Sequence, residues 1–564
     1  MDQAELRELG MLPSDKVRGA LDAGDFAKAL ALCDNLAREF ILMHKGLRIV
    51  VDLLLPHNEQ VFRREQAAIS ERIKAAIAAG DKDGALRLID EKRERQYRPI
   101  HDAMIDFKMG TYDYVLPHYG EQQLYDCQRY VAAGQRAGFT KWEQSTVEDH
   151  LRAITFIFAL HLGKTTVAED DEKYTATLDP CGTGGKAVRT GQVQPEGRHA
   201  RVANALPMTF QRPDFPAYCA HCAVWDEICA IEWFGHPLRV FEPWRQPSDP
   251  CLWHLYKDPN DIPAEHWTMF GLQKPANLPK PARGAPLSRE ELAALGLTAS
   301  DKVRAALEAG KRDEALALCA DLPKEYALMV KGLGLVVHTC LEYNEALFRR
   351  EQVAITERIK AAIGDGDKEG AIALIERKRR QHLDIHDVDI AFMATTMSWL
   401  YTAFGDQALY DCQQYLAEEQ RRGFQDWENM AAEDFVRATA FLMSLHADGK
   451  LTVQEDAEKF TFVADPCGTG GKMQREGLND PPISRYARVS KPQPMTFNQP
   501  DFPTYCTHCA VWNTIAPIEW WGHPQWVHTP ARRPNDPCVI QIYKNKDAVP
   551  ADYYRRVGKE PPAG

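Results

Sequence analysis

The sequence predicts an α+β protein made of two homologous modules, each a mainly helical lobe followed by a Cys-rich lobe of loops and short strands. Three observations predict this. The chain has 564 residues, more than one hydrophobic core usually organises. Most of it occurs twice. In each copy, helical periodicity gives way to a stretch dense in Pro, Gly, Trp and Cys. The composition, 45% hydrophobic and 26% charged, is typical of globular protein.

Charge and hydropathy bear on partners and location. Lys and Arg number 68 against 80 Asp and Glu, a net charge of −12, so the chain lacks the basic excess that binding to a nucleic-acid backbone requires. The N-terminal residues contain no hydrophobic signal segment, and the longest apolar stretch, Ile49–Leu55, is far shorter than a membrane span of about 18 residues. We expect a cytoplasmic protein with no nucleic-acid or membrane partner.

The duplication has a period of about 286 residues. Phe62–Gln66 recurs at Phe348–Gln352, and Asp179–Lys186 recurs at Asp465–Lys472. Between the copies, residues 273–287 carry four prolines and few large apolar side chains, which is typical of a linker. A tandem duplication of this kind predicts two similar modules docked as a pseudo-dimer within one chain.

Each module divides into two lobes. Residues 15–35 and 71–93 place apolar side chains at helical spacing on both sides of an Ala-Gly-Asp turn, which predicts helical hairpins. Ser14 and Asp25 are the expected N-caps of the first hairpin. The predicted divisions are a helical lobe at 1–165, a Cys-rich lobe at 166–272, the linker at 273–287, a second helical lobe at 288–450 and a second Cys-rich lobe at 451–564.

The duplication sorts the 14 cysteines by whether they recur. Cys229 and Cys340 have no counterpart, so a function shared by the copies does not depend on them. Two recurring pairs fall on apolar helical faces, where buried core thiols are expected: Cys33 with Cys319, and Cys127 with Cys412. Four cysteines remain in each half, namely Cys181, Cys219, Cys222 and Cys251, matched by Cys467, Cys506, Cys509 and Cys538.

The spacing of these four cysteines is typical of a metal site. The intervening residues number 37, 2 and 28 in the first copy and 38, 2 and 28 in the second. A C-x-x-C knuckle offers two thiolates to one ion, and two further cysteines complete a tetrahedral set that suits zinc. The sequence therefore predicts about two zinc ions per chain, each ordering a lobe with little core of its own. Open alternatives are an iron–sulfur cluster, a redox-active C-x-x-C pair, unligated thiols, and a ligand role for His221 or His508.

Candidates for catalysis lie near the knuckle and in the helical lobe. A zinc ion with four cysteine ligands has no open position, so catalysis would need other groups. A carboxylate among tryptophans and a histidine four residues later suit general acid–base work, although a structural carboxylate explains the pattern as well. The predicted catalytic residues are Glu232 and His236, their counterparts Glu519 and His523, and the histidines of two matched His-Asp pairs, His101 and His386.

The Gly-Thr-Gly-Gly-Lys segment after Cys181 has two interpretations. Its backbone N–H groups and Lys186 can cradle an anion, and a tight turn around a metal ligand explains the glycines equally well. It is not a P-loop, because Pro180 stands where the first glycine is needed and no Ser or Thr follows Lys186.

The features follow one order in each half: a helical His-Asp segment, Cys-Gly-Thr-Gly-Gly, a Tyr-Cys-x-His-Cys knuckle and a closing Asp-Pro-Cys. In this order they resemble a set of bacterial Cys-rich proteins grouped as L-2-amino-thiazoline-4-carboxylic acid hydrolase-like. The resemblance covers most of each half and implies hydrolytic opening of a small heterocycle, with water added to a C=N carbon. This chain departs from that family in being a tandem double copy, which leaves the substrate open.

Taken together, these features predict a metal-containing hydrolase or lyase that acts on a small polar or aromatic molecule in a cleft between the helical and Cys-rich lobes. A non-catalytic zinc-stapled binding module is one alternative, and an iron–sulfur redox protein is another. Both copies keep nearly all candidate polar groups, which favours chemistry. Because His118 corresponds to Ala403 and His44 to Val330, a single active copy is also an open alternative.

Overall fold

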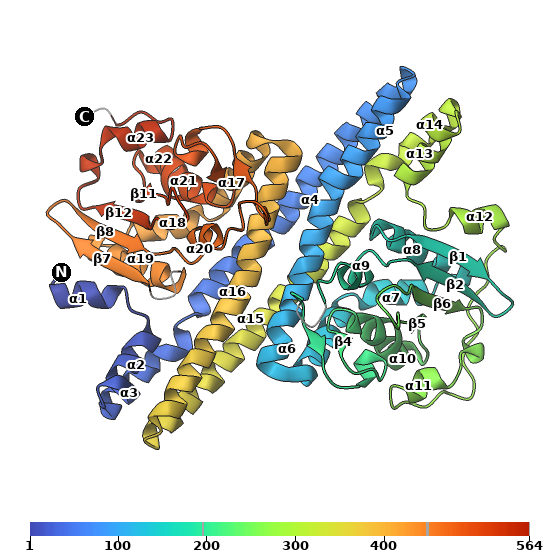
Figure 1. Ribbon diagram of the computed structural model, residues 1–564, viewed down its shortest axis with the longest axis horizontal. Helices are drawn as coiled ribbons and strands as arrows, with labels where there is room; N and C mark the ends of the chain where they lie inside the picture. The colour runs from blue at the N-terminus through green and yellow to red at the C-terminus, as the bar shows by residue number, and fades with distance from the viewer. Residues whose placement is uncertain (194–196, 447–449, 563–564) are drawn as a thin grey trace. The chain divides into compact units, whose positions relative to one another are not determined.

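A computed structural model describes residues 1–193, 197–446 and 450–562. The α+β class is confirmed, with long helices and two similar four-stranded sheets (Figure 1). The chain forms two compact units. Unit 1 consists of Met1–His57 and Glu345–Gly564, and unit 2 consists of Asn58–Asn344. Each unit therefore contains sequence from both repeats.

Unit 2 is built around a long helix and an antiparallel sheet with strand order β1-β2-β6-β5. Side-chain caps start several of its helices: Asp81 accepts from the N–H of Gly84, and Thr146 accepts from the N–H of Asp149. Its helical segments are α5 (Lys82–Asp90), η2 (Glu91–Tyr97), α6 (Arg98–Gly134), α7 (Arg136–Glu143), α8 (Val147–Leu160), α9 (Gly184–Arg189), η3 (Pro207–Thr209), η4 (Cys222–Ile228), α10 (Cys229–Phe234), η5 (Pro259–Asp261), α11 (Glu265–Thr268), α12 (Arg289–Ala294), α13 (Ala299–Glu308), α14 (Arg312–Leu318) and η6 (Cys319–Lys324). Its strands are β1 (Thr165–Glu169), β2 (Lys173–Leu178), β3 (Arg201–Val202), β4 (Phe215–Pro216), β5 (Val240–Glu242) and β6 (Cys251–Tyr256).

Unit 1 repeats this arrangement, with strand order β11-β12-β8-β7. Two 38-residue helices, α4 (Ile41–Ala78) and α15 (Ala327–Gly364), contribute residues to both units. The other helical segments of unit 1 are α1 (Gln3–Leu9), α2 (Pro13–Asp22), α3 (Phe26–Leu32), η1 (Cys33–Arg38), α16 (Lys368–Phe404), α17 (Asp406–Glu419), α18 (Arg421–Glu428), α19 (Ala432–His446), α20 (Gly470–Arg475), η7 (Pro494–Thr496), α21 (Thr507–Ala510), η8 (Val511–Ile515), α22 (Ala516–Trp521), η9 (Lys546–Ala548) and α23 (Ala551–Arg556). Its strands are β7 (Leu451–Glu455), β8 (Lys459–Ala464), β9 (Arg488–Val489), β10 (Phe502–Pro503), β11 (Val527–Thr529) and β12 (Cys538–Tyr543).

Each unit packs the helical hairpin of one repeat against the long helices of the other. In unit 2, Val303 and Leu322 of the second repeat share a buried apolar cluster with Ile73 and Ile89 of the first. Figure 1 shows the yellow-green hairpin α13–α14 beside the blue α5. Unit 1 contains the equivalent cluster, made by the hairpin α2–α3 with α15 and α16. The predicted core thiols Cys33, Cys319, Cys127 and Cys412 are all buried.

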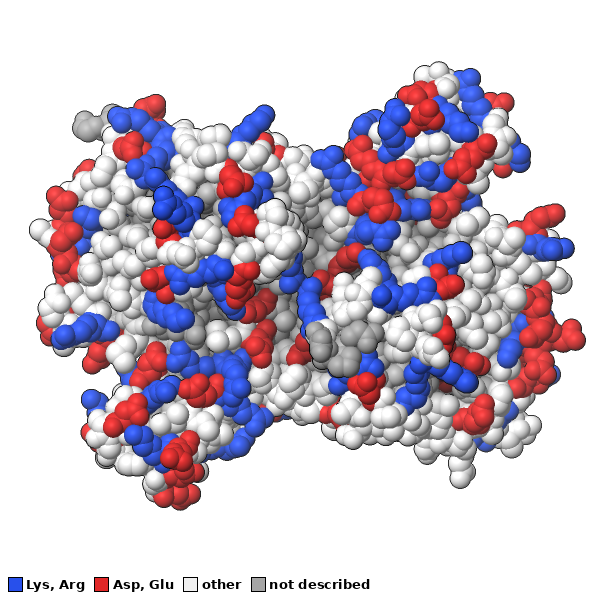
Figure 2. Space-filling model, viewed as in Figure 1, with Lys and Arg blue, Asp and Glu red and all other residues white. Residues whose placement is uncertain are grey.

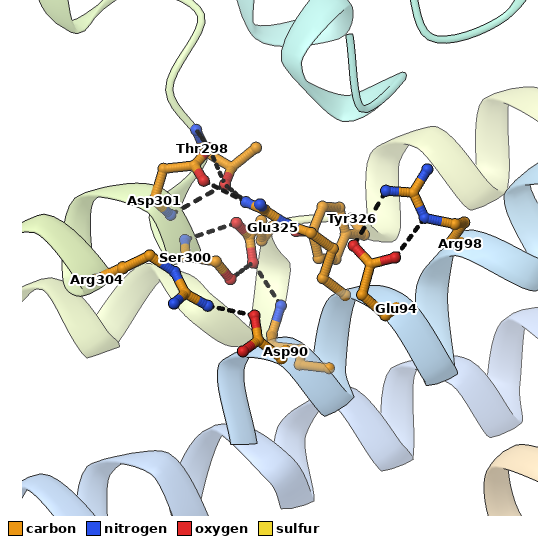
Figure 3. Close-up of polar contacts among 11 residues, drawn as sticks. Asp90, Glu94, Arg98, Thr298, Ser300, Asp301, Arg304, Glu325 and Tyr326 are labelled. Carbon is orange, nitrogen blue, oxygen red and sulfur yellow. Dashed lines mark hydrogen bonds and ion pairs between the residues drawn. The ribbon is translucent and has the colours of Figure 1, made fainter. Parts of the chain in front are cut away.

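A buried ion pair fastens the hairpin of unit 2. The Nζ of Lys92 lies 2.5 Å from a carboxylate oxygen of Glu325, and both side chains are fully buried. Ser300 donates to the same carboxylate through its N–H at 2.7 Å and its hydroxyl at 2.6 Å. Figure 3 shows this carboxylate and, in the same region, the separate ion pair of Asp90 with Arg304.

Unit 1 has the same fastening, in which Lys378 and the N–H of Ser14 both bind Glu39. The expectation that Ser14 is an N-cap is therefore wrong, because its helix already begins at Pro13 and its N–H serves the buried carboxylate. Asp25 does cap α3, as predicted, by accepting from the N–H of Lys28.

One extra residue in the first repeat is absorbed as a π-helix. Lys92 and Lys378 are 286 positions apart, whereas His101 and His386 are 285 apart, so the first repeat is longer by one residue between them. The structure places η2 at this point, where the second repeat has continuous α-helix in α16. A single-turn widening of this kind accommodates an insertion without unfolding the helix. Both lysines therefore keep their buried carboxylates, and both histidines keep their partners.

Charged side chains of both signs are interspersed on the face shown in Figure 2, most densely over the end of α5, α13 and α14. Among the described residues, no helix combines the length and the apolar composition needed to cross a bilayer.

Candidate functional site

A cavity of about 780 Å³ lies in unit 2 between α6, α8, the cysteine loops and the sheet. The four cysteines predicted to bind metal in the first repeat all line it: Cys181, Cys219, Cys222 and Cys251. They arrive from separate elements. Cys181 precedes α9, the knuckle leads into η4, and Cys251 begins β6 opposite Leu178 of β2. Residues far apart in the sequence therefore form one wall of one cavity.

The glycines after Cys181 make room for sulfur. A Cβ at position 184 would lie 2.5 Å from the Sγ of Cys219, and a Cβ at position 185 would lie 3.3 Å from the Sγ of Cys181. Real carbon and sulfur atoms do not approach as closely as 2.5 Å, so Gly184 lets Cys219 reach the start of α9. Gly470 and Gly471 stand in the same relation to the sulfurs of the second repeat. Of the two interpretations of this segment, the geometry favours the turn around sulfur.

Cys181 is surrounded by hydrogen-bond donors. The thiol of Cys251 donates to it, which lowers the pKa of Cys181 to about 6 against the opposing effect of burial. The N–H of Gly185 lies 3.1 Å from the sulfur and acts in the same direction. In unit 1, Cys467 accepts from the N–H of Gly471 at 3.3 Å, and its pKa is lowered to about 5 by the same causes.

His221, in the knuckle, lines the cavity and is half-buried. Its Nδ1 lies 2.6 Å from the carbonyl oxygen of Tyr218, so Nδ1 carries the proton and donates it. The other nitrogen, Nε2, is 3.7 Å from the Sγ of Cys222. Burial lowers the pKa of His221 well below its usual value, so the ring is neutral.

The metal site predicted from the cysteine spacing stays a prediction. Within the described ranges, no group of three or more His, Cys, Asp and Glu side chains is gathered closely enough to hold a metal ion as the side chains stand. The residues nevertheless fit such an ion chemically, because four thiols share one cavity wall and Gly184 admits a second sulfur beside Cys181.

A chain of hydrogen bonds leads from a half-exposed carboxylate to the cavity. The Nζ of Lys186 lies 2.7 Å from Asp102, whose other oxygen lies 2.9 Å from the Nδ1 of His101. The Nε2 of His101 lies 2.9 Å from the Nδ1 of His161, and His161 lines the cavity. The predicted catalytic residue His101 therefore does not line the cavity itself but binds His161, which does. Lys186 binds Asp102.

The order of bonds decides where the protons are. Burial raises the pKa of Asp102, but hydrogen bonds from His101 and Lys186 outweigh it and the net pKa is lowered. The resulting carboxylate accepts from the Nδ1–H of His101. In the arrangement where the Nε2 of His101 accepts a hydrogen bond, the donor is the Nδ1–H of His161. The Nε2 of His161 then has a free lone pair. Burial lowers the pKa of His161 well below its usual value, which favours the neutral ring.

Unit 1 contains the same chain. His386 lies 3.1 Å from Asp387 and 3.1 Å from the Nδ1 of His446, and Lys472 binds the same aspartate. The predicted residue His386 is therefore the counterpart of His101 in its contacts as well as in the sequence.

The structure does not bring the predicted Glu–His pair together. Glu232 forms an ion pair with Arg129 at 2.6 Å, and the Nε2 of His236 lies 3.1 Å from Glu143. The reason is Gly235, which has φ 86° and ends α10 between them, so the four-residue helical spacing is broken. Neither side chain lines the large cavity. The counterparts also have separate partners, Glu519 with Lys559 and His523 with Glu428.

Three buried charged residues of the cavity wall were missed by the sequence analysis: Lys108 of α6, Asp226 of η4 and Arg239 before β5. His161 was missed as well. One signal was available for the charged set, because the second repeat has Met393, Asn513 and Trp526 at these positions. The differences between the two repeats identify these three positions, whereas composition and apolar periodicity do not.

The described geometry thus combines a cysteine wall, a histidine chain and buried cations in one cavity. Comparisons of this chain with protein-family models, with curated proteins and with solved structures find no match, so its resemblance to L-2-amino-thiazoline-4-carboxylic acid hydrolase-like proteins stays a prediction.

Proposed function

We propose that the chain is an enzyme, a hydrolase or lyase, that acts on a small molecule in the cavity of unit 2 with His161 as the general base. The observation that carries this proposal is the hydrogen-bonded chain from Asp102 through His101 to His161, which ends in that cavity. A general base needs an unprotonated nitrogen within reach of the reacting proton, and the tautomers leave one on His161. His101 and Asp102 are positioning residues, because they hold that tautomer.

We propose further that the cysteine wall holds a zinc ion in each unit, as a closed site that orders the loops around the cavity. The support is the convergence of four cysteines from separate elements and the absence of a side chain at Gly184 where the second sulfur approaches. Such an ion would stabilise the fold, and the proton transfer would remain with His161.

Zinc content tests this site. Protein purified without added metal is expected to contain about two zinc ions per chain, and Cys222→Ser is expected to lose one of them, together with thermal stability. Cys229→Ser is the matched control, since Cys229 is buried next to the same segment, does not line the cavity and corresponds to Ala516. Elemental analysis and thermal melting provide the measurements. A Cys222→Ser protein with its full zinc content would contradict the site, and brown protein containing iron would favour the cluster.

Measurement of substrate turnover tests the role of His161 as the general base. The sequence resemblance suggests L-2-amino-thiazoline-4-carboxylate as the first substrate to assay. Addition of water to its C=N carbon and cleavage of the C–S bond would release a thiol that a disulfide reagent detects. His161→Ala is expected to lower kcat by about 10²- to 10⁴-fold. His446→Ala, the same change in unit 1, is the control for effects on folding. Full turnover by His161→Ala would remove the proposal.

A second candidate function is covalent catalysis by Cys181. Its pKa of about 6 makes it a thiolate near neutral pH, and it faces the same cavity. Metal-free protein whose Cys181 is alkylated much faster than its other cysteines would favour this candidate over the zinc site.

A further inference from the structure

The two units provide an internal comparison. The cysteines and the histidine chain occur in both units, so they serve a function or a fold that the units share. Residues that occur only in unit 2 indicate a function of unit 2 alone. The buried charges of its cavity wall fall in this second group.

Lys108 presents an unpartnered ammonium to the cavity. The residue is 3% exposed and lines the cavity wall. Its Nζ lies 3.8 Å from the ring centroid of Trp225 and 4.9 Å from that of Tyr218, so aromatic faces surround the charge. Within the described part of the chain, no hydrogen-bond acceptor or carboxylate pairs with it. An ammonium in this position has donors left for a ligand.

Arg239 adds a second cation to the same wall. It is 4% exposed, binds Asp226 and lies 2.9 Å from the Nε2 of His150. Its Nε–H is buried and has no acceptor among the described residues. The guanidinium lies over the ring of Trp142, 4.8 Å from its centroid.

Only one of the two buried cations of the wall is paired with a carboxylate. Asp226 binds Arg239, whereas Lys108 has no carboxylate partner among the described residues. An uncompensated buried charge is costly, so an anion in the cavity would be favourable. The cysteine wall does not itself require the lysine, because unit 1 holds the same cysteines with Met393 at that position.

In unit 1, uncharged residues occupy the positions of these buried charges. Asn513 stands in place of Asp226 and Trp526 in place of Arg239. Trp526 packs into a buried apolar cluster with Phe435 and Ile540, so the position that carries a cation in unit 2 is part of the core in unit 1.

We infer that unit 2, and not unit 1, binds a small organic monoanion with an apolar body, whose charged group is held by Lys108 and Arg239. The apolar body follows from the rest of the wall, which includes Phe158 and Trp253, and from Leu328 and Leu335 of α15, which line the cavity while 56% and 47% exposed. This inference deepens the proposed function, because it names the class of substrate that its cavity would take.

A matched pair of fluorescent probes tests the inference. Anilinonaphthalene sulfonate carries one negative charge, and N-phenyl-1-naphthylamine has the same body without it. The full chain is expected to bind the anion at one site. Lys108→Met should weaken anion binding about tenfold or more, because charge-assisted hydrogen bonds are lost. Binding of the neutral probe should be unchanged. The methionine at position 393 indicates that the fold accepts this substitution.

Lys141→Met is the control, since Lys141 lines the same cavity but is exposed, and it should change affinity less than about twofold. Lys108→Arg retains the charge and should retain anion binding. The inference is overturned if Lys108→Met binds the anion as tightly as the full native chain, if both probes weaken together in a folded variant, or if two equivalent sites are found. None of these measurements needs metal or turnover, so a metal-free protein that binds through Lys108 contradicts the zinc site and leaves this inference standing.

Discussion

Glu325→Ala is expected to lower the free energy of unfolding of unit 2 by about 3–5 kcal/mol, because it leaves the ammonium of Lys92 buried without a counter-charge. Both side chains of the pair are fully buried. The same substitution removes the acceptor of two hydrogen bonds from Ser300, so the start of α13 also loses its anchor. Urea unfolding followed by tryptophan fluorescence measures the change.

The control for this prediction is a separate, partly exposed ion pair of the same region. Arg304→Ala removes the ion pair with Asp90, whose side chains are 27% and 60% exposed, and should cost less than about 1 kcal/mol. Glu39→Ala should reproduce the large effect in unit 1, where Glu39 binds Lys378. Equal small losses from Glu325→Ala and Arg304→Ala would show that the buried pair does not fasten the hairpin.

The half chain 1–283 is expected to fold only as a dimer. In the whole chain, Ile73 and Ile89 are covered by Val303 and Leu322, which this fragment lacks. Its own hairpin α2–α3 has the equivalent apolar face, which in unit 1 covers Ile359 of the second repeat. A second copy of the fragment can supply that hairpin, whereas a single copy leaves an apolar surface exposed.

Light scattering and circular dichroism of the fragment at several concentrations check this prediction. The expected result is helix content that falls as the dimer dissociates. Coexpression with residues 284–564 should give a one-to-one complex, which is the control for the fragment's ability to fold. A helical monomer that persists on dilution would show that the hairpin folds back within its own repeat.

The sequence predicts the cysteine wall better than any other part of the site. The spacing around Cys219 and Cys222 is a local pattern, and its recurrence separates these cysteines from Cys229. Helical hairpins and the α+β class are also local, because apolar periodicity and glycine turns determine them.

The exchange of hairpins between repeats is not visible in the sequence. Lys92 and Lys378 are equivalent, as are Glu39 and Glu325, so each lysine finds the same partner chemistry in its own repeat and in the other. Only the path of the chain in three dimensions decides between them. Because the two repeats carry equivalent residues at these positions, the sequence does not show which lysine pairs with which glutamate.

Two other features of the site were not predicted, one because the chain changes direction and the other because the residues are far apart in the sequence. Glu232 and His236 have helical spacing, but Gly235 turns the chain between them. Lys108 and His161 are 53 residues apart in the sequence and belong to different helices, so no local pattern unites them at one cavity. Sequence patterns identify residues that are close together in the sequence, whereas the residues of this site are close together only in the folded structure.

The exchanged hairpins also bear on how the two copies diverged. In a dimer of identical single repeats, any substitution would appear in both cavities at once. Fusion into one polypeptide gives each copy its own mutational history, so a tryptophan at position 526 can fill one interior while an arginine persists at position 239 in the other. The altered copy still cannot be discarded, because it supplies a helical hairpin without which its neighbour has no complete core.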